Sequence, residues 1–141
     1  MTAPSPTRVG VGLIERGGSY LIRRRPAGNG SPMPGVWEVP GGKVEPGETP
    51  AEATARECRE EVGLSIDVGV LNRRTVHEYP HGLVELFYFH ARPSDPDAEP
   101  DPESGFRWVR AADLPSYTFP PANECLIADL AAHAGEGPPE E

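Results

Sequence analysis

The sequence predicts a single α/β domain, in which a mixed β-sheet has helices packed on its faces. Short β-prone segments recur along most of the chain, whereas only two longer segments carry a helical pattern. The 141 residues are enough for one hydrophobic core and too few for two. The 37% hydrophobic and 25% charged residues are typical of a globular chain. We expect the domain to span residues 1–134, with a flexible acidic tail at 135–141.

The first part of the chain predicts a β-hairpin. Residues 8–15 and 19–25 are both β-rich, and a Gly-Gly pair between them is a turn signal. Because side chains alternate along a strand, Arg23 and Arg25 are expected to share one face. Residues 26–35 are rich in Gly and Pro, which predicts a loop.

The second half of the chain predicts two strands, two short elements and a terminal helix. Aromatic and β-branched residues predict the strands, and the spacing of Leu126, Ile127, Leu130 and Ala131 predicts the helix. In order, we expect a strand within 66–79, a strand at 83–92, an acidic surface loop at 93–105, a short strand at 106–109, a helical turn at 111–115 and a helix at 121–134.

The segment between these halves, "PGGKVEPGETPAEATARECREEVGL", predicts a tight Gly-rich turn, a loop and a helix. Thr49 is a suitable N-cap, Pro50 fits the first helical position, and Glu52 completes a capping box. Gly63 is a suitable C-terminal stop. The helix should pack on the sheet through a narrow apolar stripe formed by Ala51, Ala55, Cys58 and Val62.

The same helix crowds carboxylates onto one face. At 100° per residue, Glu57, Glu60 and Glu61 fall within about 100° of arc, and Arg56 can pair with Glu60. A solvated charged face is the commoner explanation of such a run. However, the preceding turn brings backbone carbonyls and the Glu48 carboxylate toward the same point. Converging hard oxygens with excess negative charge favour Mg²⁺ or Mn²⁺.

This segment resembles the Nudix box, G-x5-E-x7-R-E-U-x-E-E-x-G-U, where U is a bulky aliphatic residue. The matching residues are Gly42, Glu48, Arg56, Glu57, Glu60, Glu61, Gly63 and Leu64. One position departs, because Cys58 stands where an aliphatic residue is usual, and a small buried hydrophobe should be tolerated there. The resemblance implies a Nudix α/β/α sandwich and a divalent-metal hydrolase that splits a nucleoside diphosphate linked to another moiety.

The resemblance also implies roles for individual residues. Glu57, Glu60 and Glu61, with the Gly41 carbonyl, would hold Mg²⁺, which Mn²⁺ could replace. Either Glu57 or Glu48 would be the general base, and Arg56 would orient a glutamate.

The rest of the chain resembles the MutT-type branch of the family, over about residues 8–132. "FPPANE" places Asn123 where that branch recognises 8-oxoguanine, and an amide can both donate to and accept from a purine edge. Helix capping is the alternative role of Asn123. Arg25, with Arg23, is implied to bind phosphate, and Tyr79 could stack on a base or anchor a loop. The single lysine, Lys43, is a weaker phosphate candidate.

Two departures leave the substrate open. Gly82 stands where the branch has an arginine near the base, and Arg107 stands where it has an additional metal-binding glutamate. Glu103 lies close enough in sequence to substitute for that glutamate. The resemblance therefore implies hydrolysis of a nucleoside triphosphate to the monophosphate and pyrophosphate, on 8-oxo-dGTP, on a pyrimidine triphosphate or over a broad range. A catalytically silent nucleotide-binding module is a further alternative, and the complete glutamate set argues against it.

Composition excludes several other classes. A net charge of −9 argues against a protein that tracks duplex nucleic acid, and no apolar run approaches 18 residues, so no membrane span is expected. The first eight residues lack the apolar core of a secretory signal. We expect Cys58 and Cys125 to be reduced core residues of a cytoplasmic protein, which would be a monomer or a homodimer.

Overall fold

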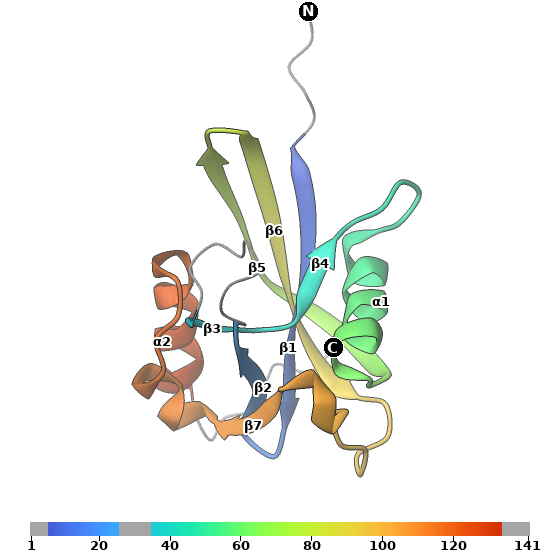
Figure 1. Cartoon of the computed structure of the whole chain (residues 1–141), viewed down its shortest axis with the longest axis vertical. Helices are drawn as coiled ribbons and strands as arrows, with labels where there is room; N and C mark the ends of the chain where they lie inside the picture. The colour runs from blue at the N-terminus through green and yellow to red at the C-terminus, as the bar shows by residue number, and fades with distance from the viewer. Residues whose placement is uncertain (1–5, 26–34, 134–141) are drawn as a thin grey trace, which may run out of the picture.

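The computed structural model of the chain describes residues 6–25 and 35–133. These residues form one twisted sheet with a helix on each side (Figure 1). The strands are β1 (Thr7–Arg16), β2 (Ser19–Arg24), β3 (Trp37–Glu38), β4 (Gly41–Lys43), β5 (Ile66–Tyr79), β6 (Gly82–Pro93) and β7 (Arg107–Arg110). The helices are α1 (Pro50–Val62) and α2 (Glu124–Ala132), with 3-10 turns η1 (Pro102–Ser104), η2 (Ala111–Ser116) and η3 (Pro121–Asn123).

The sheet is mixed, as the sequence predicts. Its order is β3-β2-β1-β6-β5, with β4 paired to β1 and β7 paired to β2. Strand β1 runs parallel to β6 and antiparallel to β2 and β4. Strands β5 and β6 form a long antiparallel hairpin. The predicted α/β class with helices on both faces is thus confirmed. The predicted tail and nearly all of the predicted 26–35 loop lie outside the described residues.

Two buried clusters fill the two sides of the sheet. One lies under α2 and η2 and includes Leu13, Ile22, Tyr88 and Leu126, and the other lies under α1 and includes Cys58. Figure 1 shows α1 and α2 on opposite sides of the strands. The central strands therefore present hydrophobic side chains on both faces.

Glycines in β1 allow α1 to approach the sheet closely. A Cβ on Gly10 would lie 2.4 Å from Thr54 Oγ1 and 2.5 Å from the Pro50 carbonyl oxygen. A Cβ on Gly12 would lie 2.9 Å from Cys58 Sγ. Because real Cβ contacts are longer than this, only glycine permits the observed helix–strand distance. This close packing fixes the helix that carries the predicted glutamates.

The local helix signals are confirmed, but several other predictions are wrong in detail. Gly41–Lys43 is not a turn but strand β4, because its backbone pairs with β1. The buried face of α1 includes Ala53 and Thr54, while the predicted Ala51 and Ala55 are only partly buried. The terminal helix starts at Glu124 rather than at 121, after a 3-10 turn.

The two cysteines differ. Cys58 is fully buried, as predicted, whereas Cys125 is exposed and does not belong to the core. It lies on the solvent side of the first turn of α2, one residue before the buried stripe begins at Leu126. The predicted acidic surface loop at 93–105 is also attached to α1, because the Asp101 amide donates to the Val62 carbonyl oxygen at the end of that helix.

Candidate active site

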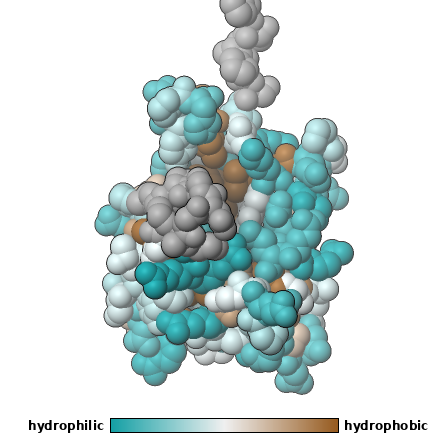
Figure 2. Space-filling model, viewed as in Figure 1, coloured by the Kyte–Doolittle hydropathy of each residue, from teal (hydrophilic) through white to brown (hydrophobic). Residues whose placement is uncertain are grey.

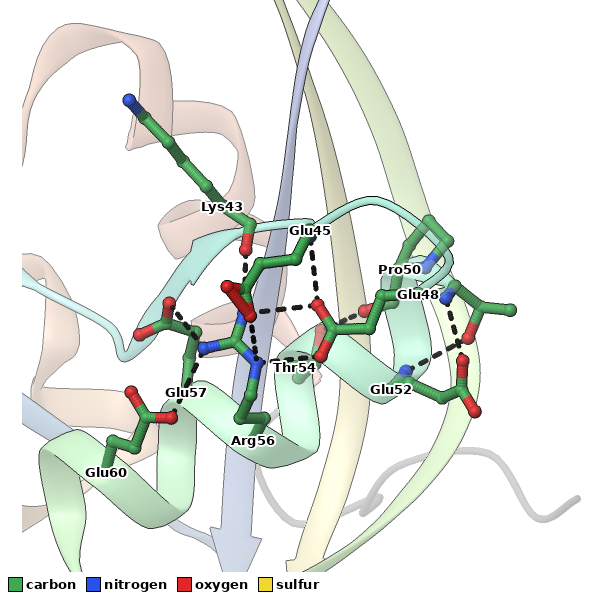
Figure 3. A network of polar contacts seen from close by, with 10 residues as sticks. Lys43, Glu45, Glu48, Pro50, Glu52, Thr54, Arg56, Glu57 and Glu60 are labelled. Atoms are coloured by element: carbon green, nitrogen blue, oxygen red, sulfur yellow. Dashed lines mark hydrogen bonds and ion pairs between the residues drawn. The ribbon is translucent and has the colours of Figure 1, made fainter.

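Helix α1 holds its carboxylates in fixed positions because both of its ends are capped. The Thr49 side chain accepts from the Glu52 amide, and the Glu52 carboxylate accepts from the Thr49 amide, which completes the capping box. At the other end Gly63 adopts the left-handed conformation, with φ of 81°. Between these caps, the Glu57 and Glu60 side chains point toward Arg56 (Figure 3).

Arg56 is the centre of a dense ion-pair network at this face. Its Nε donates to Glu48 Oε2 at 2.7 Å, and its Nη2 donates to Glu48 Oε1 at 3.1 Å. Its Nη1 donates to Glu57 at 3.2 Å and to Glu60 at 3.3 Å, and its Nη2 also reaches the Lys43 carbonyl oxygen (Figure 3). One guanidinium therefore joins the loop carboxylate to two helical carboxylates.

This network changes the acidity of its members. The hydrogen bond from Arg56 holds the pKa of Glu48 below its usual range, and a backbone hydrogen bond from the Glu45 amide adds to this effect. The same contact with Glu48 raises the pKa of Arg56. The contact thus favours the ionised form of Glu48. Glu45, which the sequence prediction missed, also lies 3.4 Å from Arg56.

Strand β4 forms the opposite wall of the site. A Cβ on Gly42 would lie 2.2 Å from Glu57 Cδ, so the absent side chain is what makes room for this carboxylate. The Gly41 amide donates to Glu61 Oε1 at 3.0 Å. Burial raises the pKa of Glu61, although the bond from Gly41 opposes that rise. The two glycines therefore position two of the three helical glutamates.

The two predicted phosphate-binding arginines both face Glu38. Arg23 Nε and Arg25 Nε each lie 2.8 Å from a different oxygen of this carboxylate. Arg23 also lies 3.5 Å from Glu61 and packs its guanidinium over the Phe106 ring. The sequence prediction missed Glu38, whose position in β3 opposite Arg23 is a consequence of strand pairing.

The donor set fits a hard divalent cation in its chemistry. Carboxylates outnumber arginines here, and each predicted ligand presents oxygen. In residues 6–25 and 35–133, however, no three acidic, histidine or cysteine side chains are already arranged as a metal site. Glu57 and Glu60 point to Arg56, and Glu61 points to Gly41 and Arg23. Because a carboxylate has about four acceptor positions on its two oxygens, each of these side chains can keep its present partner and still offer a lone pair to a cation.

The predicted base-recognition residue lies on the other side of the sheet from α1. Asn123 ends η3, and its Nδ2 donates to the Tyr88 hydroxyl at 2.9 Å. Its side chain makes no capping bond with α2, so the capping alternative is not what the structure shows. Nearby, partly buried Val9 and Leu86 pack against the same core, and Figure 2 shows apolar surface over β1 and β6 in this region. Asn123 therefore contacts the same buried cluster that this apolar surface adjoins.

The remaining predicted positions are spread more widely. Tyr79 ends β5 at the tip of the hairpin, is 41% exposed, and stacks on His81 at a centroid distance of 5.4 Å. Arg107 lies over the Trp37 and Tyr117 rings. Glu103 is exposed in η1, and Gly82 begins β6 with a φ of 136°.

Comparison with known proteins decides the family. The NUDIX domain family matches residues 4–130, which is most of the chain. The chain belongs to the Nudix family. It is 31% identical over 128 residues to the 8-oxo-dGTP diphosphatase of Escherichia coli, a match that covers 87% of this chain and 95% of that protein. These features make the chain a Nudix hydrolase, related to nucleoside triphosphate diphosphatases.

A second relative has the same level of identity. The CTP pyrophosphohydrolase of E. coli is 31% identical over 115 residues, covering 82% of this chain and 84% of that protein. Among solved structures, the E. coli ORF135 protein superimposes with a TM-score of 0.75 at 29% identity, covering 95% of this chain and 94% of that one. The chain therefore has the Nudix fold and belongs to the pyrophosphohydrolase class, and these two relatives are named for an oxidised purine nucleotide and for CTP. None of the described helices is long and apolar enough to cross a membrane.

Proposed function

We propose that this Nudix hydrolase converts a nucleoside triphosphate to the monophosphate and pyrophosphate with Mg²⁺, and that its preferred substrate is 8-oxo-dGTP. One observation carries the proposal. Glu57 and Glu61 on one face of α1 lie against the glycines of β4, Arg56 joins Glu57 and Glu60 to the loop residue Glu48, and Asn123 is hydrogen bonded to the buried Tyr88. The fold thus offers one region suited to phosphates and one suited to a base.

The glutamates would act through bound metal. Glu57, Glu60 and Glu61, with the Gly41 carbonyl, would hold Mg²⁺, for which Mn²⁺ can substitute. The metal would neutralise phosphate charge and lower the pKa of an attacking water. Glu57 or Glu48 would accept the proton from that water. Arg56, which binds both of these carboxylates, would keep the base oriented.

Arg23 and Arg25 would bind the phosphate groups. Both are now paired with Glu38, so phosphate binding would exchange one oxyanion partner for another. Tyr79 lies at the hairpin tip, and its exposed ring would stack on the base. We further propose that the enzyme works in the cytoplasm as a monomer or homodimer, where it removes oxidised nucleotides before they enter DNA.

A pyrimidine or broad-range substrate is the second candidate, and two observations favour it. The CTP pyrophosphohydrolase of E. coli is as similar in sequence as the 8-oxo-dGTP diphosphatase of that organism. In addition, Gly82 provides no side chain where a base-contacting arginine is expected, and a Cβ built there would meet nothing within 4 Å.

A nucleotide panel separates these candidates. Steady-state kcat/KM would be measured with Mg²⁺ for 8-oxo-dGTP, dGTP, dCTP and CTP. The proposal predicts the highest value for 8-oxo-dGTP. A higher value for either cytidine nucleotide would replace it with the pyrimidine candidate. Binding of all four nucleotides without turnover would contradict both and would indicate a silent binding module.

A further inference from the structure

Asn123 is held by a buried phenol rather than by the helix that it precedes. Its Nδ2 donates to the Tyr88 hydroxyl, and no other side-chain hydrogen bond of Asn123 is seen among the described residues. Tyr88 lies in the middle of β6 and is only 3% exposed. A rigid, buried group on the sheet therefore determines how the Asn123 amide is turned.

We propose that Tyr88 is a positioning residue that fixes the orientation in which Asn123 meets the nucleobase. This inference rests on the proposed function, which assigns the base contact to Asn123. An amide carries a carbonyl acceptor at one end and two donors at the other, so a flip exchanges its hydrogen-bonding pattern. With one Nδ2 hydrogen bonded to Tyr88, the carbonyl oxygen and the second hydrogen are left in a fixed orientation for a ligand.

The surroundings of Tyr88 suit this role. Its ring belongs to the buried cluster that contains Leu126 and Ile127, so the ring and the amide are tied to the same end of α2. Burial raises the pKa of Tyr88, which keeps the phenol neutral at the pH where a hydrolase works. The Thr75 hydroxyl lies close enough to oppose that rise, but it completes no hydrogen bond with good geometry. Asn123 is therefore the well-formed partner of this phenol.

The test compares selectivity rather than activity alone. Tyr88→Phe, Asn123→Ala and the double variant would be assayed on 8-oxo-dGTP, dGTP and dCTP. Tyr88→Phe keeps the buried ring and removes only the hydroxyl, so we expect the ratio of kcat/KM between best and worst nucleotide to fall about three- to tenfold. Because both residues act through one contact, the double variant should have the ratio of Asn123→Ala alone.

Tyr20→Phe is the matched control. Tyr20 is 6% exposed in the same cluster, no described hydrogen bond joins it to Asn123, and its variant should keep the wild-type ratio. The proposal would be overturned if Tyr88→Phe kept the wild-type ratio of kcat/KM, or if kcat/KM fell equally for all three nucleotides. It would also be overturned if the losses in the two single variants multiplied in the double variant.

A second measurement does not depend on turnover or on Tyr88→Phe folding. In the NMR spectrum of the wild-type protein, the Asn123 side-chain amide, assigned by its loss in Asn123→Ala, should show slowed proton exchange. Fast exchange would overturn the Tyr88 contact. A third outcome is slow exchange in a wild-type enzyme that does not discriminate between bases. The Tyr88–Asn123 hydrogen bond would then be correct, but base recognition by Asn123 would be wrong, and so would the positioning role of Tyr88 that depends on it.

Discussion

Gly42 offers a direct test of how the fold positions Glu57, a proposed catalytic carboxylate. In Gly42→Ala the new Cβ would lie 2.2 Å from Glu57 Cδ and 2.4 Å from Glu57 Oε2. To restore ordinary van der Waals contact, the carboxylate must retreat by about 1.2 Å, and a displacement of about 1 Å can cost roughly 10²-fold in rate. Glu57 Cγ would also lie only 2.6 Å away, so the flexible Glu57 side chain has to move from Cγ outward, but none of the three nearest atoms belongs to the backbone. We therefore expect kcat to fall about 100-fold while Tm changes by no more than about 3 °C.

The assay pairs kcat, measured over a Mg²⁺ titration, with calorimetric Tm. Gly10→Ala is the contrasting variant, because its Cβ would meet the Pro50 carbonyl oxygen, which is helix backbone and cannot turn aside. Overpacking of this kind costs about 1–3 kcal/mol, so Gly10→Ala should lower Tm clearly. Near-normal kcat and Mg²⁺ dependence in Gly42→Ala would refute the reasoning, as would a loss of Tm equal to that of Gly10→Ala.

Two further predictions concern buried groups. Burial lowers the pKa of His90 from its usual 6.5, so the unfolded chain binds more protons than the folded one just below that pH. The stabilising effect of keeping His90 neutral on the free energy of unfolding should be complete above pH 6.5. It should be lost as the pH drops through the lowered pKa of His90. Urea unfolding of wild type and His90→Gln should show a shallower pH dependence in the variant, and equal slopes would contradict this. In the folded protein a thiol reagent should modify exposed Cys125 but not Cys58, whose pKa burial raises to about 12, and rapid modification of both would show that Cys58 is not buried.

The sequence predicts helix α1 and its acidic face well because the signals are local. Thr49, Glu52 and Gly63 act within one turn of the residues that they cap, and the 3.6-residue period alone brings the glutamates together. The alternation of Gly10 and Gly12 in β1 is a further local sign of close helix approach.

The rest of the site depends on contacts between residues that are distant in sequence. Glu38 meets Arg23 and Arg25 only because β2 pairs with β3, and the Tyr88–Asn123 bond spans 35 positions. No local sequence pattern predicts these contacts. Strand β4 was missed for a related reason: a Gly-rich segment has low β-propensity, and its pairing with β1 overrides that preference.

The measurement that tests the central claim most directly is ³¹P NMR of the reaction products in Mg²⁺, for wild type and Glu60→Gln. The account predicts that wild type releases pyrophosphate and nucleoside monophosphate, and that chelation stops the reaction. Glu60 is 59% exposed, so its replacement by Gln should leave the fold intact while it removes the charge of one proposed metal ligand. We expect turnover to fall by roughly 10²-fold or more. Release of orthophosphate and nucleoside diphosphate, or a near-normal rate for Glu60→Gln at millimolar Mg²⁺, would contradict the account.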